Sequence, residues 1–157
     1  PQHETPKQAY NRYKKHLQQR ITPITSKSFD SIEKGIIRLQ IAHRYLSNQQ
    51  ARFLVERMSI KTDDGYLWRW DPRHKHLSAI GFDIERHLYL LNQIQAPTHL
   101  IFGNKSWYQH LNGLENRIQA LPNLQKTITI EGGHSLHYEQ PSLLTQTILQ
   151  CLQDKNG

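Results

Sequence analysis

The strongest constraint on the fold is the alternation of helical and extended segments in the second half of the chain. Strands are predicted at 98–102 and 126–130, with helices from Asp83 to about Ile94, around 107–121, and from Ser142 to about Gln153. Strands joined by helices in this order run parallel. Because two short parallel strands leave both edges and both faces open, we expect the other strands to come from upstream sequence, or from another copy through swapping.

The first half of the chain is predicted to be mostly helical, with one hairpin. Residues 28–58 have the pattern of two helices, the first capped by Asp30 or Ser31 and the second opened by a capping box of Ser47 with Gln50. A further helix, interrupted at Thr22-Pro23, carries an apolar stripe of Ala9, Tyr10, Tyr13 and Leu17.

The hairpin is predicted between residues 59 and 70. Asp64-Gly65 is a strong signal for a tight turn between two extended runs. Tyr66, Trp68 and Trp70 alternate onto one face of the second run. This aromatic face is suited to packing the hairpin against the helices before it.

Composition bounds the class of protein. The chain has 157 residues, enough for one domain, and a net charge of +7. The basic residues are scattered; the densest group, Arg12, Lys14, Lys15 and Arg20, fits a solvated helix face better than a nucleic-acid surface. Cys151, the lone cysteine, excludes an internal disulfide and is predicted to be a small core residue.

Two further expectations concern location and completeness. The sequence has no apolar run of membrane-spanning length and no signal peptide, so we expect no membrane partner and a cytoplasmic location. The chain begins at Pro1 without an initiator Met, so we expect it to be a piece of a longer protein.

The run Glu131-Gly132-Gly133-His134 marks a candidate site. It follows the second predicted strand, and the two glycines allow a sharp turn beside His134. Imidazole titrates nearest neutral pH and is suited to proton transfer. Pro141 fits the first turn of the helix that follows.

Three motifs in order now carry a resemblance to the α/β-hydrolases. Residues 95–103, QAPTHLIFG, look like the strand after the cap in that superfamily, and 132–141, GGHSLHYEQP, resemble its catalytic-histidine loop. Residues 64–73, DGYLWRWDPR, resemble the end of the cap in the serine hydrolase-like branch. The similarity extends from about residue 28 to 154.

The resemblance implies an α/β fold: the C-terminal part of an α/β-hydrolase, with two parallel strands and flanking helices, preceded by a helical cap with a hairpin. The cap would span 1–80 and the core part 81–157. His134 would be the general base for a serine nucleophile that attacks a small ester. Tyr66, Trp68 and Trp70 would either line the substrate pocket, with Trp68 and Trp70 binding the ester, or pack the hairpin on the cap helices, and both alternatives stay open. No organic cofactor and no metal is implied.

The nucleophile and the acid are not evident in this sequence. The nucleophile of this superfamily sits in a G-x-S-x-G elbow, which is lacking here: Ser135 adjoins the histidine, and Ser106 and Ser142 have no elbow context. Where many relatives carry the acid, this chain has Asn104, Lys105 and Ser106. Asn104 would orient an imidazole through its amide oxygen. Either the acid lies upstream or this member has lost it.

Several histidines have competing interpretations. His74 with His76, and His134 with His137, are spaced as zinc pairs but lack companion carboxylates or thiolates, so no metal site is expected. His137 is predicted to pack under the last helix with its ring bonded to backbone. Two rival functions remain: a non-catalytic hydrolase homologue, and a basic module that binds nucleic acid or protein through the 1–20 helix.

Overall fold

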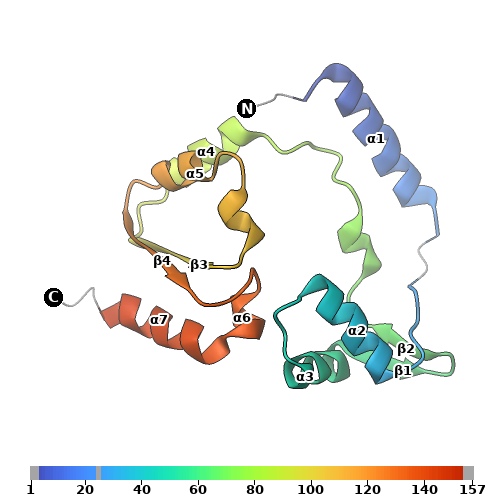
Figure 1. Ribbon diagram of the computed structural model, residues 1–157. Coiled ribbons are helices and arrows are strands. Elements are labelled where there is room, and N and C mark those ends of the chain that lie inside the picture. The colour runs from blue at the N-terminus through green and yellow to red at the C-terminus, as the bar shows by residue number, and fades with distance from the viewer. Residues whose placement is uncertain (1–3, 24–25, 154–157) are drawn as a thin grey trace.

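The computed structural model describes residues 4–23 and 26–153, and its elements follow one another as Figure 1 shows. The first half contains α1 (Pro6–Ile21), α2 (Ile32–Ala42), α3 (Asn48–Met58), β1 (Ser59–Thr62), β2 (Gly65–Trp68) and the 3-10 helix η1 (Pro72–Lys75). The second half contains α4 (Ile84–Asn92), β3 (Thr98–Gly103), the 3-10 helix η2 (Trp107–His110), α5 (Leu114–Gln119), β4 (Leu124–Ile130), α6 (Leu136–Glu139) and α7 (Pro141–Gln153).

Local capping chemistry fixes where several helices begin. The Ser31 side chain accepts the Lys34 N–H at α2, and Asp83 accepts the Arg86 N–H at α4. At α3 the Ser47 and Gln50 side chains each accept a backbone N–H of the other residue. These bonds pair N–H groups that have no partner within the helix, and the predicted capping box is confirmed.

The hairpin and the two helices before it share one hydrophobic core. Strands β1 and β2 pair antiparallel, with Thr62 opposite Gly65. Gly65 has a φ of +115°, which is unfavourable for any residue that has a side chain. Fully buried Phe29 exchanges two backbone hydrogen bonds with Tyr66 and packs on Ile36, Leu39 and Val55. The predicted turn is confirmed, and the hairpin is anchored to α2 and α3.

The second sheet has two parallel strands, as predicted. His99 of β3 lies opposite Lys126 of β4, and Gly103 lies opposite Ile130, so both strands end together. Figure 1 shows α4 and α5 on one side of these strands and α7 on the other. Within the described residues neither sheet has a third strand, and the side chains of 98–102 stay only half buried.

Helix α1 lies apart from the hydrophobic cores. Within the described residues it buries no side chain, and Tyr10, Tyr13 and Leu17 are exposed. It contacts the segment after η1: Arg12 and His16 bond to the carbonyls of Ser78 and Leu77. Arg12 also forms an ion pair with Glu4 that lowers the pKa of Glu4.

One prediction about an element is wrong. Residues 107–121 do not form a single helix: η2 ends at His110 and α5 begins after Gly113, whose φ is +75°. A left-handed backbone at Gly113 cannot continue a helix.

The predicted boundary between a cap (1–80) and a core part (81–157) stays a prediction. Residues 1–3, 24–25 and 154–157 fall outside the described ranges.

Candidate active site at the end of the parallel strands

His134 lies on the loop that leaves β4, where the chain turns through Gly132 and Gly133. Gly132 has φ of +145°, and a Cβ there would come within 2.7 Å of the Leu136 side chain. Buried Glu139 accepts the Gly133 N–H through its carboxylate. A left-handed glycine and a buried carboxylate therefore fix the loop, while the His134 side chain remains exposed.

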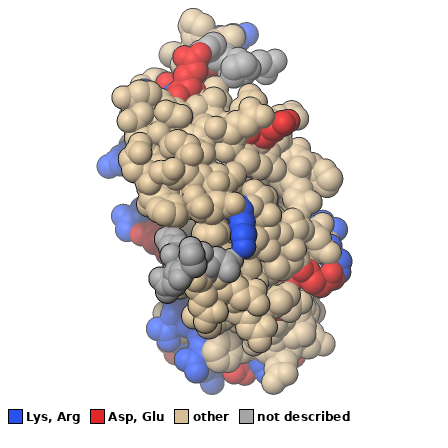
Figure 2. Space-filling view, turned by 90° about the vertical axis from the view of Figure 1, so that its left-hand side faces the viewer, with Lys and Arg blue, Asp and Glu red and all other residues tan. Residues whose placement is uncertain are grey.

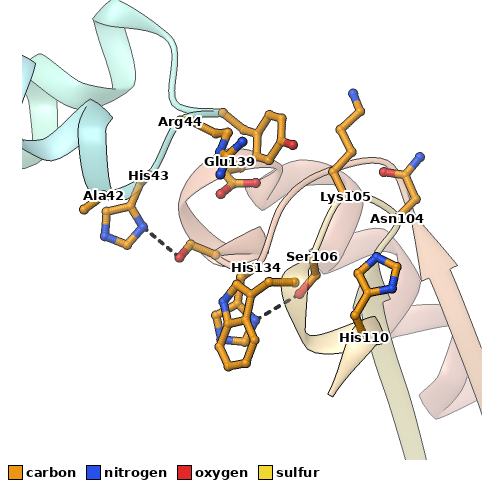
Figure 3. Close-up of a pocket in the computed structure, with 12 residues that line it drawn as sticks. Ala42, His43, Arg44, Asn104, Lys105, Ser106, His110, His134 and Glu139 are labelled. Carbon is orange, nitrogen blue, oxygen red and sulfur yellow. Dashed lines mark hydrogen bonds between the residues drawn. The ribbon is translucent and has the colours of Figure 1, made fainter. Parts of the chain in front are cut away.

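The His134 ring is held on one side by Ser106. Its Nδ1 is hydrogen-bonded to the Ser106 hydroxyl at 3.1 Å, as Figure 3 shows. Ser106 is 4% exposed, and its Oγ also accepts the Tyr108 N–H at 3.2 Å. The Trp107 and Tyr108 rings lie 4.8 Å and 5.9 Å from the imidazole, between centroids. His134 lines a cavity, and no residue that the structure describes hydrogen-bonds to its Nε2.

Of the three residues that the sequence places at the acid position, Ser106 is the one that contacts His134, and Asn104, for which an orienting role was predicted, does not. The Asn104 amide donates to Glu131 and its oxygen accepts the Gly132 N–H, so it does not orient His134. Figure 3 shows Asn104 directed away from the imidazole. The sequence feature that marks Ser106 as a site residue is its position three residues after Gly103, which ends the strand beside β4.

Lys105 and Glu131 form an ion pair across the ends of the two strands. Lys105, with a smaller contribution from Asn104, holds the pKa of Glu131 below its ordinary value, and Glu131 raises the pKa of Lys105. Both side chains are exposed, so the pair adds little to stability. It does occupy the Glu131 carboxylate, which therefore does not serve His134.

A cavity of about 360 Å³ opens beside the imidazole. Its walls come from two parts of the chain, 42–45 and 104–110, and from the His134 loop. Glu139, the carboxylate that lines it, is engaged by Gly133, whereas Arg44 and Lys105 bring positive charge. The walls therefore combine bases, hydroxyls and cations around one exposed imidazole.

The α2–α3 region is joined to the His134 loop by direct contacts. His43, at the end of α2, bonds through Nδ1 to the Ser135 hydroxyl at 3.0 Å. Gln50 of α3 donates to the Glu139 carbonyl at 3.0 Å, and Tyr138 packs on the hydrophobic core of α2 and α3. The position of this loop therefore depends on the helices before the hairpin.

Trp68 and Trp70 line a second cavity, of about 590 Å³, and do not reach the one beside His134. Their rings stack at 4.4 Å between centroids, and Trp68 also packs on Phe29 at 4.8 Å. Both cavities share Ala42, His43 and Ser135 as a wall. Trp68 thus takes part in core packing and in a cavity wall, while Trp70 lies further out.

The prediction for His137 is wrong. Its side chain is exposed, and its ring contacts Tyr138 at 3.9 Å between centroids. In the α6 turn His137 is carried to the surface while Leu136 and Glu139 point inward. Cys151, by contrast, is buried in α7 as predicted.

Within the part of the chain that the structure describes, no three His, Cys, Asp or Glu side chains are grouped so as to hold a metal ion. No helix among residues 4–23 and 26–153 is long and apolar enough to cross a membrane.

Comparison with known proteins relates this geometry to hydrolases. No family model matches the sequence. Among solved structures, the thioesterase domain from the curacin biosynthetic pathway aligns with a TM-score of 0.80 and 25% identity, over 96% of this chain and 54% of its own. A Mycobacterium tuberculosis esterase aligns with a TM-score of 0.69 and 17% identity, over 94% of this chain and 49% of its own.

The fold, with a histidine on the loop after a parallel strand, places the chain in the α/β-hydrolase superfamily. Within it, the chain is a homologue of the serine hydrolase-like protein of Danio rerio, with 29% identity over 129 residues. The alignment covers 79% of this chain but 40% of that relative. The chain therefore spans less than half the length of this relative and about half of the solved structures.

Proposed function

We propose that this chain is the C-terminal part of a serine-type α/β-hydrolase that acts on a small ester, with His134 as general base. The observation that carries the proposal is the His134 ring: Nδ1 is bonded to Ser106, the residue lines a cavity, and no described residue hydrogen-bonds to Nε2. A base in acyl transfer needs this arrangement, with one nitrogen held and the other open.

In the proposed reaction, Nε2 of His134 takes the hydroxyl proton of a serine as the serine oxygen attacks the ester carbonyl. The carbonyl π electrons move onto oxygen, the tetrahedral adduct collapses, and the imidazolium returns the proton to the departing alcohol. Water then hydrolyses the acyl-enzyme by the same proton transfers. The serine and the oxyanion donors lie in sequence outside this chain.

The exposed surface around the second sheet supports the proposal that half of the hydrolase fold lies outside this chain. Two strands alone do not bury their side chains, and residues 98–102 are half buried. Helix α7 exposes Ile148, Leu149 and Leu152. Figure 2 shows that the face on the left of Figure 1 carries few Lys, Arg, Asp or Glu side chains. Exposed aliphatic side chains such as those of α7 are typical of an interface with further protein.

Trp68 and Trp70 are proposed to bind the acyl or aromatic part of the ester. They line the larger cavity, which adjoins the His134 cavity across the His43–Ser135 bond.

We also propose a cytoplasmic location for the protein, which cell fractionation tests directly.

A fluorophosphonate probe on the full-length protein tests the proposal. We expect one labelled serine, upstream of this chain, and loss of labelling in His134→Ala with retention in His137→Ala, the exposed histidine three residues on. Residues 1–157 alone should not hydrolyse p-nitrophenyl acetate. Absence of any labelled serine, or turnover by residues 1–157 that vanishes in His134→Ala, would contradict the proposal.

The second candidate is a non-catalytic hydrolase homologue. It is favoured by one observation: the residue that contacts Nδ1 of His134 is a neutral serine, not a carboxylate. Serine labelling in the same experiment excludes this candidate.

A further inference from the structure

Ser106 lies where its hydroxyl can hold the imidazole of His134 by a hydrogen bond. It lies three residues after β3 ends, and His134 lies four residues after β4 ends, so the parallel pairing of the two strands brings both side chains to one edge. The bond is 3.1 Å long, and Ser106 is almost fully buried while His134 is exposed. The serine is therefore the fixed partner and the imidazole is the group being held.

A hydroxyl and a carboxylate make different partners for Nδ1. A carboxylate only accepts, so it requires a proton on Nδ1 and leaves Nε2 free as a base. A hydroxyl accepts from Nδ1–H or donates to a bare Nδ1, and in the second case Nε2 carries the proton and cannot act as a base. The Ser106 oxygen already accepts the Tyr108 N–H, so donating to Nδ1 would also use its single O–H proton and leave one lone pair.

The other groups around the cavity do not supply the missing charge. Glu131 is bound by Lys105 and Asn104, and the Glu139 carboxylate by the Gly133 N–H. The remaining ionisable side chains of the cavity wall are cations, histidines or a phenol: His43, Arg44, Tyr45, Lys105 and His110. Among the residues that the structure describes, no carboxylate contacts His134.

We propose that Ser106 is the positioning residue for His134 and that it orients the ring without fixing which nitrogen carries the proton. This inference rests on the proposed function and adds how the base is controlled. The Nε2–H form is populated in the resting site, so part of the protein is not ready to accept a proton. Replacing Ser106 with a carboxylate would select the Nδ1–H form and stabilise the imidazolium.

The test follows the His134 ring by ¹⁵N NMR in the full-length protein across pH, in the wild type and in S106D, S106T and S106A. Wild type should show the Nε2–H form, and S106D should show Nδ1–H with a titration midpoint raised by about one pH unit or more. The matched control is N104D, which adds a carboxylate two residues away and should move the midpoint much less. In kinetics, S106D should raise kcat. The acidic limb of its pH–kcat profile should have the same midpoint as the His134 titration followed by NMR.

Two results would overturn the inference. One is a wild-type ring already fully in the Nδ1–H form, which would mean that an upstream acid holds it. The other is an identical titration in all Ser106 variants. If S106D does not fold, S106T, which keeps the hydroxyl, should retain the wild-type proportion of the two forms, and S106A should change it. Fluorophosphonate labelling is scored separately, so an inactive protein with a Ser106-dependent ring would reject the proposed function alone.

Discussion

His43 and Ser135 are hydrogen-bonded at 3.0 Å between Nδ1 and Oγ, although 92 residues separate them in sequence. His43 caps the end of α2, and Ser135 directly follows His134, so the bond joins the helices before the hairpin to the His134 loop. A hydrogen bond of this kind contributes about 0.5–1.5 kcal/mol.

The bond predicts a measurable coupling. Ser135→Ala should lower the free energy of unfolding by about 1 kcal/mol, because the half-buried His43 nitrogen loses its partner. A double-mutant cycle with His43→Ala in urea denaturation should give a coupling of about 1 kcal/mol. Ser142→Ala, at an exposed serine of α7, is the control and should change stability by less than about 0.5 kcal/mol. Additive effects of the two substitutions would show that the bond is not formed in solution.

Glu139 should be more important for stability than its charge suggests. It is 6% exposed, and its carboxylate accepts the Gly133 N–H. Glu139→Ala leaves that buried N–H without an acceptor and should cost about 1–3 kcal/mol in thermal or urea unfolding. Glu139→Gln keeps an amide oxygen at the same place and should cost clearly less. Equal losses in both variants would point to the charge and not to the hydrogen bond.

Gly103 should tolerate no side chain. A Cβ there would lie 2.5 Å from the Gly132 carbonyl oxygen and would also collide with that of Gly133. Because the obstacle is backbone, Gly103→Ala should destabilise the protein by about 1–3 kcal/mol and displace His134 from Ser106. Gly81→Ala is the control, since the nearest atom to its Cβ is the movable end of Glu4. Calorimetry compares the stability of the two variants, and serine labelling compares their reactivity. Equal losses in Gly103→Ala and Gly81→Ala would contradict the close approach of Gly103 to the Gly132 and Gly133 carbonyls.

Asp71 provides a pH prediction. Its carboxylate accepts from the Arg73 side chain and backbone, which lowers its pKa from 3.8 to about 2. Because the folded pKa lies below the unfolded one, the associated stability is fully present above pH 3.8 and is lost as pH falls through about 2. Carboxyl ¹³C NMR should give a midpoint near 2 that rises toward 3.8 in Arg73→Ala. Arg69→Ala, whose guanidinium bonds the Ser59 carbonyl instead, should leave the midpoint unchanged.

Trp70 should affect substrate binding more than folding. It lines the larger cavity and stacks on Trp68, which itself packs on buried Phe29. For the full-length protein, the proposed ester hydrolysis predicts that Trp70→Ala raises KM for an aryl ester about tenfold, with little change in kcat. Phe53→Ala, at an exposed ring of α3 that lines a different cavity, is the control. An unchanged KM in Trp70→Ala would assign the tryptophans to packing alone.

Much of the local structure could be predicted from the sequence because its causes are local. The Ser47–Gln50 box, the Asp64-Gly65 turn and the Asp83 cap each involve residues within three positions of one another. The parallel pairing of β3 and β4 followed from the order of the elements. Gly113 was the missed local signal, since its left-handed backbone separates η2 from α5.

The site was harder to predict because its contacts depend on the pairing of distant segments. Ser106 and His134 meet only when Gly103 lies opposite Ile130, and that register is not visible in either segment alone. Asn104 was an equally good candidate by spacing, but its side chain is taken by Glu131 and Gly132. The outward direction of His137 likewise follows from the short α6 turn, in which Leu136 and Glu139 take the inward positions.

The hydrogen bond from Gln50 to the Glu139 carbonyl has a consequence for how proteins with this loop change over evolution. Since Glu139 also holds the turn before His134, a substitution that tilts α3 would displace the His134 ring as well. With His134 as the proposed base, selectivity and turnover would then change together. Replacing α2 and α3 with the helices of another protein should succeed only when residues 135 and 139 are exchanged as well.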